Sequence, residues 1–394
     1  MSQETIVIVG MARTPMGGFQ GDLSGASAPE LGATAIKAAV ERAGLKPGDI
    51  DEVLMGCVLA AGQGQAPARQ AALGAGLPLG VNCTTVNKMC GSGMKTMMIA
   101  FDALKAGSAE IIVAGGMESM TNAPYLLPKA RGGMRLGHGT VQDHMFLDGL
   151  EDAYDKGRLM GTFAEETAEK YQFTREAQDD FAIGSLAKSK AATEDGSFAA
   201  EITPVTISTR KGDVVVEHDE QPLKGRPEKI PTLRPAFKKD GTVTAANSSS
   251  ISDGAAALVM MKASTAEKRG LKPIAKFVAH SSHAHEPAWF TTAPISAIQK
   301  VMKTTGWGSG DIDLYEINEA FAVVTMAATR DLELDPKKVN IHGGACALGH
   351  PIGASGARIS VTLLSALQKT GGKKGVASLC IGGGEATAVA LELL

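Results

Sequence analysis

The segment Ala43-Gly-Leu-Lys-Pro-Gly-Asp-Ile-Asp51 returns, in altered form, as Thr305-Gly-Trp-Gly-Ser-Gly-Asp-Ile-Asp313. Five of the nine positions are identical, and each copy stands between a helical pattern and a strand-like run. Such a turn is also a common connector between a helix and a strand, so coincidence is the alternative explanation. The flanking sequence favours a duplication, because a shift of 262 residues carries Cys90 to position 352. Both places have a glycine-rich turn that opens a helical pattern.

A second internal repeat pairs the strand-like run Glu110–Gly116 with Val376–Gly382. Short β-branched runs alternate with longer helical patterns along the chain, which is typical of βαβ units around mostly parallel, covered sheets. The first helix shows clear signals, with a capping box at Ser27–Glu30 and a stop at Gly44. We therefore predict the α/β class, built as two copies of one unit whose equivalent turns meet near a pseudo-two-fold axis.

Composition suggests where these copies begin and end. Residues 1–120 form the first half, which we expect residues 246–272 to complete, and residues 273–394 form the second half. Between them, residues 121–245 are richer in glycine, proline and charge. This stretch predicts an inserted domain of mixed loops and helices.

The overall composition narrows the functional classes. The 394 residues are 44% hydrophobic and 21% charged, values typical of soluble globular proteins. A formal charge of −3 offers no basic field for nucleic acid, and no apolar run reaches the roughly 20 residues of a membrane span. Five cysteines without a C-x-x-C pair indicate free thiols rather than a disulfide framework. Because the N-terminus enters a strand pattern without a targeting sequence, we expect a cytoplasmic protein.

The motif Asn87-Lys-Met-Cys90-Gly-Ser-Gly93 places a cysteine just before a predicted helix. Unpaired backbone N–H groups at a helix start favour a thiolate, so we expect the pKa of Cys90 to be lowered. The same N–H groups can receive an oxyanion. The alternative is a buried, inert cysteine, which is the commoner case for a lone motif of this kind.

Three other residues add to the candidate site. His350 stands in the equivalent turn of the second half, and a Cys–His pair is the minimal activated nucleophile; a histidine bonded only to backbone is the alternative. Cys380 ends a buried strand beside Gly382, where a second thiol suits either redox pairing or proton transfer. Asn318 stands at another strand-to-helix turn, and its alternative role is a helix N-cap.

Together these motifs resemble the thiolase family. The resemblance is closest to its short-chain acetyl-CoA acetyltransferases and covers essentially the whole chain in order. The motifs that carry it are Asn87–Gly93, Gly115–Met120, Asn318–Phe321, Gly343–Arg358 and Cys380–Gly384. A ketoacyl-synthase relative shares the two-copy plan but needs a second histidine in place of the last motif, which this chain lacks.

The resemblance implies a layered α-β-α-β-α core, with the inserted domain covering a coenzyme A site. It implies acetyl-CoA C-acetyltransferase activity, in which two acetyl-CoA condense reversibly to acetoacetyl-CoA and CoA through an acetyl-Cys90 intermediate. His350 takes the proton of Cys90, and Cys380 removes the α-proton of the second acetyl-CoA. One oxyanion site uses His350 with a water held by Asn318, and the other uses the backbone N–H groups of Cys90 and Gly382.

Substrate contacts follow from the same resemblance. Residues matching the family's pantetheine tunnel are Leu150, Met160, Phe237, Ala245, Ser249 and Phe321. The basic residues Lys224 and Arg226 are candidates for the CoA phosphates, although such charge runs are usually solvated surface. The chain departs from the short-chain pattern at Leu159, Ser248–Ser250, Phe290–Pro294 and Ala386, so a 3-ketoacyl-CoA thiolase for longer chains and a non-condensing acyl-CoA-binding protein remain alternatives.

The remaining expectations concern cofactors and assembly. We expect no cofactor beyond CoA as the substrate carrier, and no metal, because His280, His283 and His285 lack a completing cluster of thiols or carboxylates. The stretch Ala130–His144 resembles the family's tetramerisation loop. A homotetramer, formed as a dimer of dimers, is therefore expected.

Overall fold

Ten strands form one continuous mixed sheet in the computed structural model, which describes residues 4–394. Nine of them follow the order β12-β13-β14-β11-β1-β10-β5-β3-β4, and β2 (Gly17–Gly18) pairs with β10. The first-half strands are β1 (Ile6–Arg13), β3 (Glu52–Gly56), β4 (Asn82–Val86), β5 (Ile111–Ser119) and β10 (Ser252–Lys262). The second-half strands are β11 (Ala275–Ala284), β12 (Leu314–Ile317), β13 (Lys374–Ile381) and β14 (Glu385–Leu393).

The strand order reads the same outward from the seam between β1 and β11. On one side come β10, β5 and β3, and on the other β14, β13 and β12. The two halves share only a short register at this seam, where Ile6–Ile8 of β1 pairs with Ala275–Phe277 of β11. The strand order therefore supports the predicted duplication.

The repeated segment makes the same hydrogen bonds in both copies. The Asp51 carboxylate accepts from the backbone N–H groups of Glu110 and Ile111, at 2.9 Å each. The Asp313 carboxylate accepts from Lys373 and Lys374, at 2.7 and 2.9 Å. Each aspartate follows a short 3-10 turn, η1 (Pro47–Asp49) or η6 (Ser309–Asp311). The likeness of the two segments is thus structural, and coincidence is the wrong explanation.

Two details of the prediction are wrong. These hydrogen bonds place Glu110 in the position of Lys373, so the proposed match of Glu110 with Val376 is displaced by three residues. The sheet is also not mostly parallel, because only β3–β4, β3–β5 and β12–β13 are parallel pairs. The tight turn at Gly382–Gly384 sends β14 back along β13, which makes that pair antiparallel.

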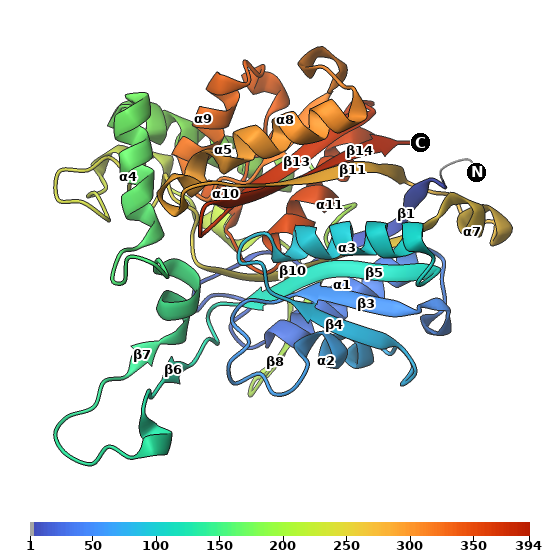
Figure 1. Ribbon diagram of the computed structural model, residues 1–394, viewed down its shortest axis with the longest axis horizontal. Helices are drawn as coiled ribbons and strands as arrows, with labels where there is room; N and C mark the ends of the chain where they lie inside the picture. The colour runs from blue at the N-terminus through green and yellow to red at the C-terminus, as the bar shows by residue number, and fades with distance from the viewer. Residues whose placement is uncertain (1–3) are drawn as a thin grey trace.

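Helices separate and cover the two halves of the sheet (Figure 1). The helices α1 (Ala28–Arg42) and α2 (Pro67–Gly74) cover the outer face of the first half, and α8 (Ala293–Thr305) covers the outer face of the second. Between the halves lie α3 (Ser92–Ala106) and α11 (Ser355–Thr370), which contact each other and both sets of strands. The expected α/β class and layered α-β-α-β-α core are confirmed.

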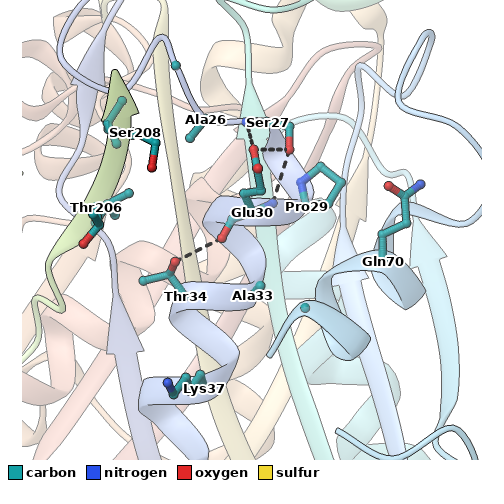
Figure 2. Close-up of a pocket in the computed structure, with 14 residues that line it drawn as sticks. Ala26, Ser27, Pro29, Glu30, Ala33, Thr34, Lys37, Gln70, Thr206 and Ser208 are labelled. Carbon is teal, nitrogen blue, oxygen red and sulfur yellow. Dashed lines mark hydrogen bonds between the residues drawn. The ribbon is translucent and has the colours of Figure 1, made fainter. Parts of the chain in front are cut away.

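The start and end signals in the sequence correctly located α1. The Ser27 hydroxyl accepts from the Glu30 backbone N–H, and the Glu30 carboxylate accepts from Ser27 N, as a capping box requires (Figure 2). The face of α1 that carries Leu31 and Ala35 is buried against the sheet. After the helix, Gly44 takes a left-handed conformation with φ of +70°.

The chain between β5 and β10 forms a set of additional elements, several of which pack against the layers. A thin hairpin formed by β6 (Tyr125–Leu126) and β7 (Gln142–Asp143) projects from the body (Figure 1). The other elements here are η2 (Ala130–Gly132), η3 (Phe146–Leu150), α4 (Met160–Tyr171), α5 (Arg175–Glu194), β8 (Val205–Thr209), β9 (Gly212–Val216), α6 (Glu220–Lys224) and η4 (Pro227–Thr232). The short helix α7 (Ala263–Lys268) follows β10 and contacts β1 and β10 of the first half. The remaining elements of the second half are η5 (Pro287–Thr292), α9 (Ala322–Asp331), η7 (Pro336–Lys338) and α10 (Ala345–Leu348).

Candidate active site

The N-terminal turns of α3 and α11 touch in the middle layer. A Cβ atom on Gly93 would come within 2.9 Å of Ala357 N, and one on Gly356 within 2.4 Å of Met94 N. Both glycines are the second residue of their helix, so equivalent positions of the two copies pack against each other. The absence of a side chain at both positions lets the helix starts approach this closely.

Cys90 lies in the turn between β4 and α3. The Ser92 hydroxyl accepts from Lys88 N at 2.8 Å and donates to Met89 O at 2.6 Å, which closes the turn on both sides. A Cβ atom on Gly91 would lie 2.3 Å from a methyl group of Ile381, the last residue of β13. The turn that carries Cys90 is therefore packed directly against the end of the strand that carries Cys380.

Burial governs the ionisation of Cys90. It raises the pKa of the Cys90 thiol to about 11, although the backbone N–H groups of Gly382 and Cys90 act in the opposite direction. The charge of the nearby Glu118 carboxylate raises it further. The predicted lowering of this pKa is wrong for the free enzyme, because loss of water around the sulfur outweighs the helix start. The N–H groups that favour its thiolate are those predicted for an oxyanion site.

Cys380 is the penultimate residue of β13 and is fully buried. Burial raises the pKa of its thiol well above the usual range, and the neighbouring Cys90 sulfur raises it further. Such an effect falls off with distance, in keeping with the packing of the Cys90 turn against the end of β13. Cys380 also packs in an apolar cluster with Phe163, Phe290 and Phe321.

His350 is held between α10 and α11 with one ring nitrogen free. Its backbone N–H donates to Ser250 O at 3.2 Å, and its Nδ1 lies 2.5 Å from the Ser355 hydroxyl oxygen. Its Nε2 is buried and has no hydrogen-bond partner within residues 4–394. Burial, and then the charge of Arg358, lower the pKa of His350 to about 3. The ring is therefore neutral at physiological pH, and Nε2 is available for chemistry.

Asn318 follows β12 and faces the same imidazole. Its Nδ2 lies 3.5 Å from His350 Nδ1, and its Oδ1 lies 3.5 Å from Arg358 Nη2. The alternative role as a helix N-cap is wrong, because α9 begins at Ala322 with Phe321 in the cap position. The alternative for His350, a ring bonded only to backbone, is also wrong, since its ring contacts are to side chains.

Several residues expected to line the pantetheine tunnel surround this centre. Leu150 packs in the same cluster as Cys90, and the rings of Phe237 and Phe321 meet edge to face at 6.1 Å. The Met160 sulfur lies 3.3 Å from where a Cβ atom on Gly382 would be. Ser249 N donates to Ala320 O at 2.9 Å, which ties the loop of residues 242–250 to the Asn318 turn. Ala245 lies on that loop and is exposed.

The two basic residues predicted for phosphate lie on the surface. The Lys224 ammonium pairs with Glu220 at 2.6 Å and with Asp22 at 3.3 Å. A phosphate would have to compete with these two carboxylates. Arg226 is exposed, just before η4. Their role as phosphate contacts stays a prediction.

Sequence reasoning assigned no role to three residues that support the site. Ser355 contacts His350, Arg358 contacts Asn318, and the buried Glu118 accepts from the backbone N–H groups of Val58, Leu59 and Gly353. All three lie inside motifs that were already recognised. For Ser355 and Arg358 the available signal was their spacing of three residues, which puts both on one face of the first turn of α11.

Other features of the described chain lie apart from this centre. The pocket in Figure 2 lies beside α1 and β8, and its lining includes Glu30, Thr34, Gln70 and Thr206 but none of the predicted site residues. Within residues 4–394, no group of three or more histidine, cysteine, aspartate or glutamate residues is arranged to hold a metal ion. Within the same range, none of the helices has the length and apolar character needed to cross a membrane.

Comparison with known proteins identifies the relatives of this chain. Residues 6–264 match the family described as "Thiolase, N-terminal domain", and residues 271–393 match "Thiolase, C-terminal domain". Acetyl-CoA acetyltransferase 2 of Arabidopsis thaliana is 53% identical over 99% of this chain and 97% of its own length. The mitochondrial acetyl-CoA acetyltransferase of Rattus norvegicus is 50% identical, over 99% of this chain and 91% of its own.

Solved structures agree with these sequence matches. The Bacillus anthracis acetyl-CoA acetyltransferase superposes with a TM-score of 0.97 at 41% identity, covering 100% of this chain and 99% of the other. A thiolase from Ascaris suum, solved in complex with coenzyme A, gives a TM-score of 0.94 at 42% identity and covers 99% of this chain and 100% of its own.

Proposed function

Because the chain belongs to the thiolase family, we propose that it is an acetyl-CoA C-acetyltransferase that reversibly condenses two acetyl-CoA into acetoacetyl-CoA and CoA. One observation carries the proposal beyond the family. The Cys90 turn packs on the end of the strand that carries Cys380, and Cys90 packs in one cluster with Ile352, two residues after His350, whose Nε2 is buried without a partner in the described chain. Relatives of similar length at about 50% identity bear the same activity in their names, which supports this choice within the family.

The first half-reaction transfers an acetyl group to Cys90. The Cys90 S–H bond breaks as His350 Nε2 takes the proton, and the sulfur attacks the thioester carbon of acetyl-CoA. The N–H groups of Cys90 and Gly382 receive the oxyanion; their effect on the pKa of the Cys90 thiol supports this role. The bond to the CoA sulfur then breaks, and CoA leaves as a thiol with a proton from Cys380. This balance leaves a protonated His350 and a Cys380 thiolate.

The second half-reaction makes the carbon–carbon bond. The Cys380 thiolate takes an α-proton from a second acetyl-CoA, and the resulting enolate attacks the acetyl carbon on Cys90. His350 Nε2–H, together with a water held by Asn318, meets the enolate oxygen. Acetoacetyl-CoA forms, the Cys90 sulfur leaves, and His350 returns its proton to it. Every group is then back in its neutral starting form.

Aromatic packing favours a short acyl group over the longer chains of a 3-ketoacyl-CoA thiolase. The rings of Phe290 and Phe321 lie 6.5 Å apart, and those of Phe290 and Phe163 lie 6.2 Å apart, in the cluster that contains Cys380. The side chain of Phe290 is almost fully buried, so it fills space beside the second sulfur. Thiolysis rates for acetoacetyl-CoA and for longer 3-ketoacyl-CoA substrates test this preference, and equal rates would contradict it.

Intact mass after mixing with acetyl-CoA tests the reaction itself. The wild-type chain should gain one acetyl group on Cys90, and Cys90→Ala should gain none. Cys380→Ala should still acetylate, in a slowed reaction, but should form no acetoacetyl-CoA. Binding of acyl-CoA with neither acetylation nor turnover in the wild type would instead indicate a non-condensing binding protein.

The proposal extends to cofactors, assembly and compartment. The proton balance closes with two thiols and one imidazole, which supports a reaction that needs no cofactor besides CoA; full activity after chelation would support it further. Apolar residues on the projecting hairpin support a homotetramer built as a dimer of dimers (Figure 1). All five cysteines are free thiols, as suits a reducing cytoplasm. Cell fractionation tests the compartment, since the rat relative is mitochondrial.

A further inference from the structure

We propose that Ser355 is a positioning residue that keeps the single proton of the resting His350 ring on Nδ1, so that Nε2 is free to accept the proton of Cys90. This inference rests on the proposed function for its kinetic consequence. The assignment of the proton to Nδ1 is argued only from the hydrogen-bond contacts of the His350 ring.

The Ser355 hydroxyl has one hydrogen and two neighbours that compete for it. Its oxygen lies 2.9 Å from Pro351 O, a carbonyl that can only accept, and 2.5 Å from His350 Nδ1. Once the hydroxyl donates to Pro351 O, its oxygen can only accept from the ring. Nδ1 must then carry the proton. The short distance marks this as the main contact of that nitrogen.

The other neighbour of Nδ1 favours the opposite proton position. Asn318 Nδ2 is a donor 3.5 Å away, and the contact of Oδ1 with the donor-only Arg358 keeps the amide turned this way. If the Ser355 oxygen were absent, this N–H donor would be the remaining hydrogen-bond contact of Nδ1 among the described residues. The ring would then accept at Nδ1 and carry its proton on Nε2, where it cannot take the proton of Cys90.

The choice between the two nitrogens matters because the resting ring holds only one proton. Burial and Arg358 lower the pKa of His350 to about 3, so a doubly protonated ring is rare at neutral pH. The tautomer therefore decides whether Nε2 is a base or a donor. After acetylation both nitrogens are protonated, and the Ser355 oxygen still accepts from Nδ1.

The chain offers a closely matched control in Ser360. This serine lies on the same helix, is fully buried, and donates to the carbonyl of Gly356, four residues earlier, at 2.9 Å. Ser355 donates to Pro351 O across the same four-residue interval. Ser355→Ala and Ser360→Ala thus remove the same kind of backbone contact, but only Ser355→Ala removes a contact to His350.

The direct measurement is the protonation of the two ring nitrogens. In solid-state spectra of ¹⁵N-histidine-labelled protein without substrate, assigned with His350→Asn, we expect a proton on Nδ1 in the wild type and in Ser360→Ala. In Ser355→Ala we expect the proton on Nε2. A wild-type ring protonated on Nε2 overturns the proposal, even if Ser355→Ala does not fold.

The kinetic measurement is the rate of Cys90 acetylation by rapid-quench intact mass. Ser355→Ala should lower it by about 10²-fold, as expected for loss of a general base, with little change in KM. Ser355→Thr, which keeps a hydroxyl, should recover most of the rate. Equal acetylation rates for Ser355→Ala and Ser360→Ala would overturn the proposal. A wild-type chain that never acetylates would refute the proposed function, and the spectra would still test Ser355.

Discussion

At the scale of single residues, water exclusion sets the resting charge state of the centre. It raises the pKa of Cys90 to about 11 and lowers that of His350 to about 3, so the thiol and the imidazole are both neutral at pH 7. An ion pair between them would have to form against both shifts. In the proposed reaction, proton transfer is therefore coupled to attack on the bound thioester, where the new charge would meet the N–H groups of Cys90 and Gly382.

A first prediction follows for the reactivity of Cys90. Alkylation of the free enzyme by a neutral reagent such as iodoacetamide should become about tenfold faster per pH unit between pH 7 and 10, because each unit multiplies the thiolate fraction by ten below the pKa. Mapping the modified cysteine by mass spectrometry gives the rate for Cys90. A plateau near pH 7 would show that a thiolate is already present in the resting site.

A second prediction concerns acid stability. The folded-state pKa of His350 lies below its ordinary value of 6.5, so folding favours the neutral ring. Its contribution to stability is present above pH 6.5 and is lost as the pH falls from there toward 3. The loss is about 1.4 kcal/mol per pH unit for one such group. The free energy of unfolding of His350→Asn should therefore fall less steeply than that of the wild type between pH 6 and 4. Parallel curves in urea titrations would contradict this.

At the scale of elements, the duplicated turn anchors a strand in each half. Asp51 and Asp313 each accept two backbone N–H groups from the start of the neighbouring strand in the sheet, β5 or β13. Asp51→Ala or Asp313→Ala should each cost roughly 0.5–1.5 kcal/mol of stability, because two backbone donors near the surface lose a charged acceptor. Chemical unfolding measures the cost, with the exposed Asp240→Ala as the control. A cost equal to the control in both variants would show that water replaces the carboxylate.

The same turns show what sequence could and could not predict. The repeat, the capping box at Ser27 and the four catalytic candidates could be predicted from the sequence, because each depends on a short sequence motif. The antiparallel path of β14 was missed, since a tight turn at Gly382–Gly384 reverses the chain without changing its hydrophobic pattern. The pKa of Cys90 was missed for another reason: its burial depends on packing against side chains distant in the chain, such as Ile352, which lies 262 positions later. The contact of Arg358 with Asn318, 40 positions earlier, also arises only from the assembled fold.

At the scale of the whole molecule, the projecting hairpin controls assembly in our proposal. Leu136 at its tip is 99% exposed, and Leu127, Met134 and Val141 are also exposed. Apolar side chains grouped in this way favour contact with another copy of the chain. Leu136→Ser combined with Val141→Ser should convert tetramers into dimers without loss of acetylation. Sedimentation velocity provides the measurement, and an unchanged tetramer would show that other surfaces hold the dimers together.

The mirror-like order of strands about the β1–β11 seam resembles a symmetric homodimer whose subunits were joined into one polypeptide. In a true homodimer, any change to a turn is copied to its twin by symmetry. Joining the two copies in one chain lifts that constraint, so in the proposed reaction the turn of the first copy carries the nucleophile Cys90 and its counterpart carries the base His350. One continuous polypeptide can thus hold a symmetric framework and an asymmetric site together.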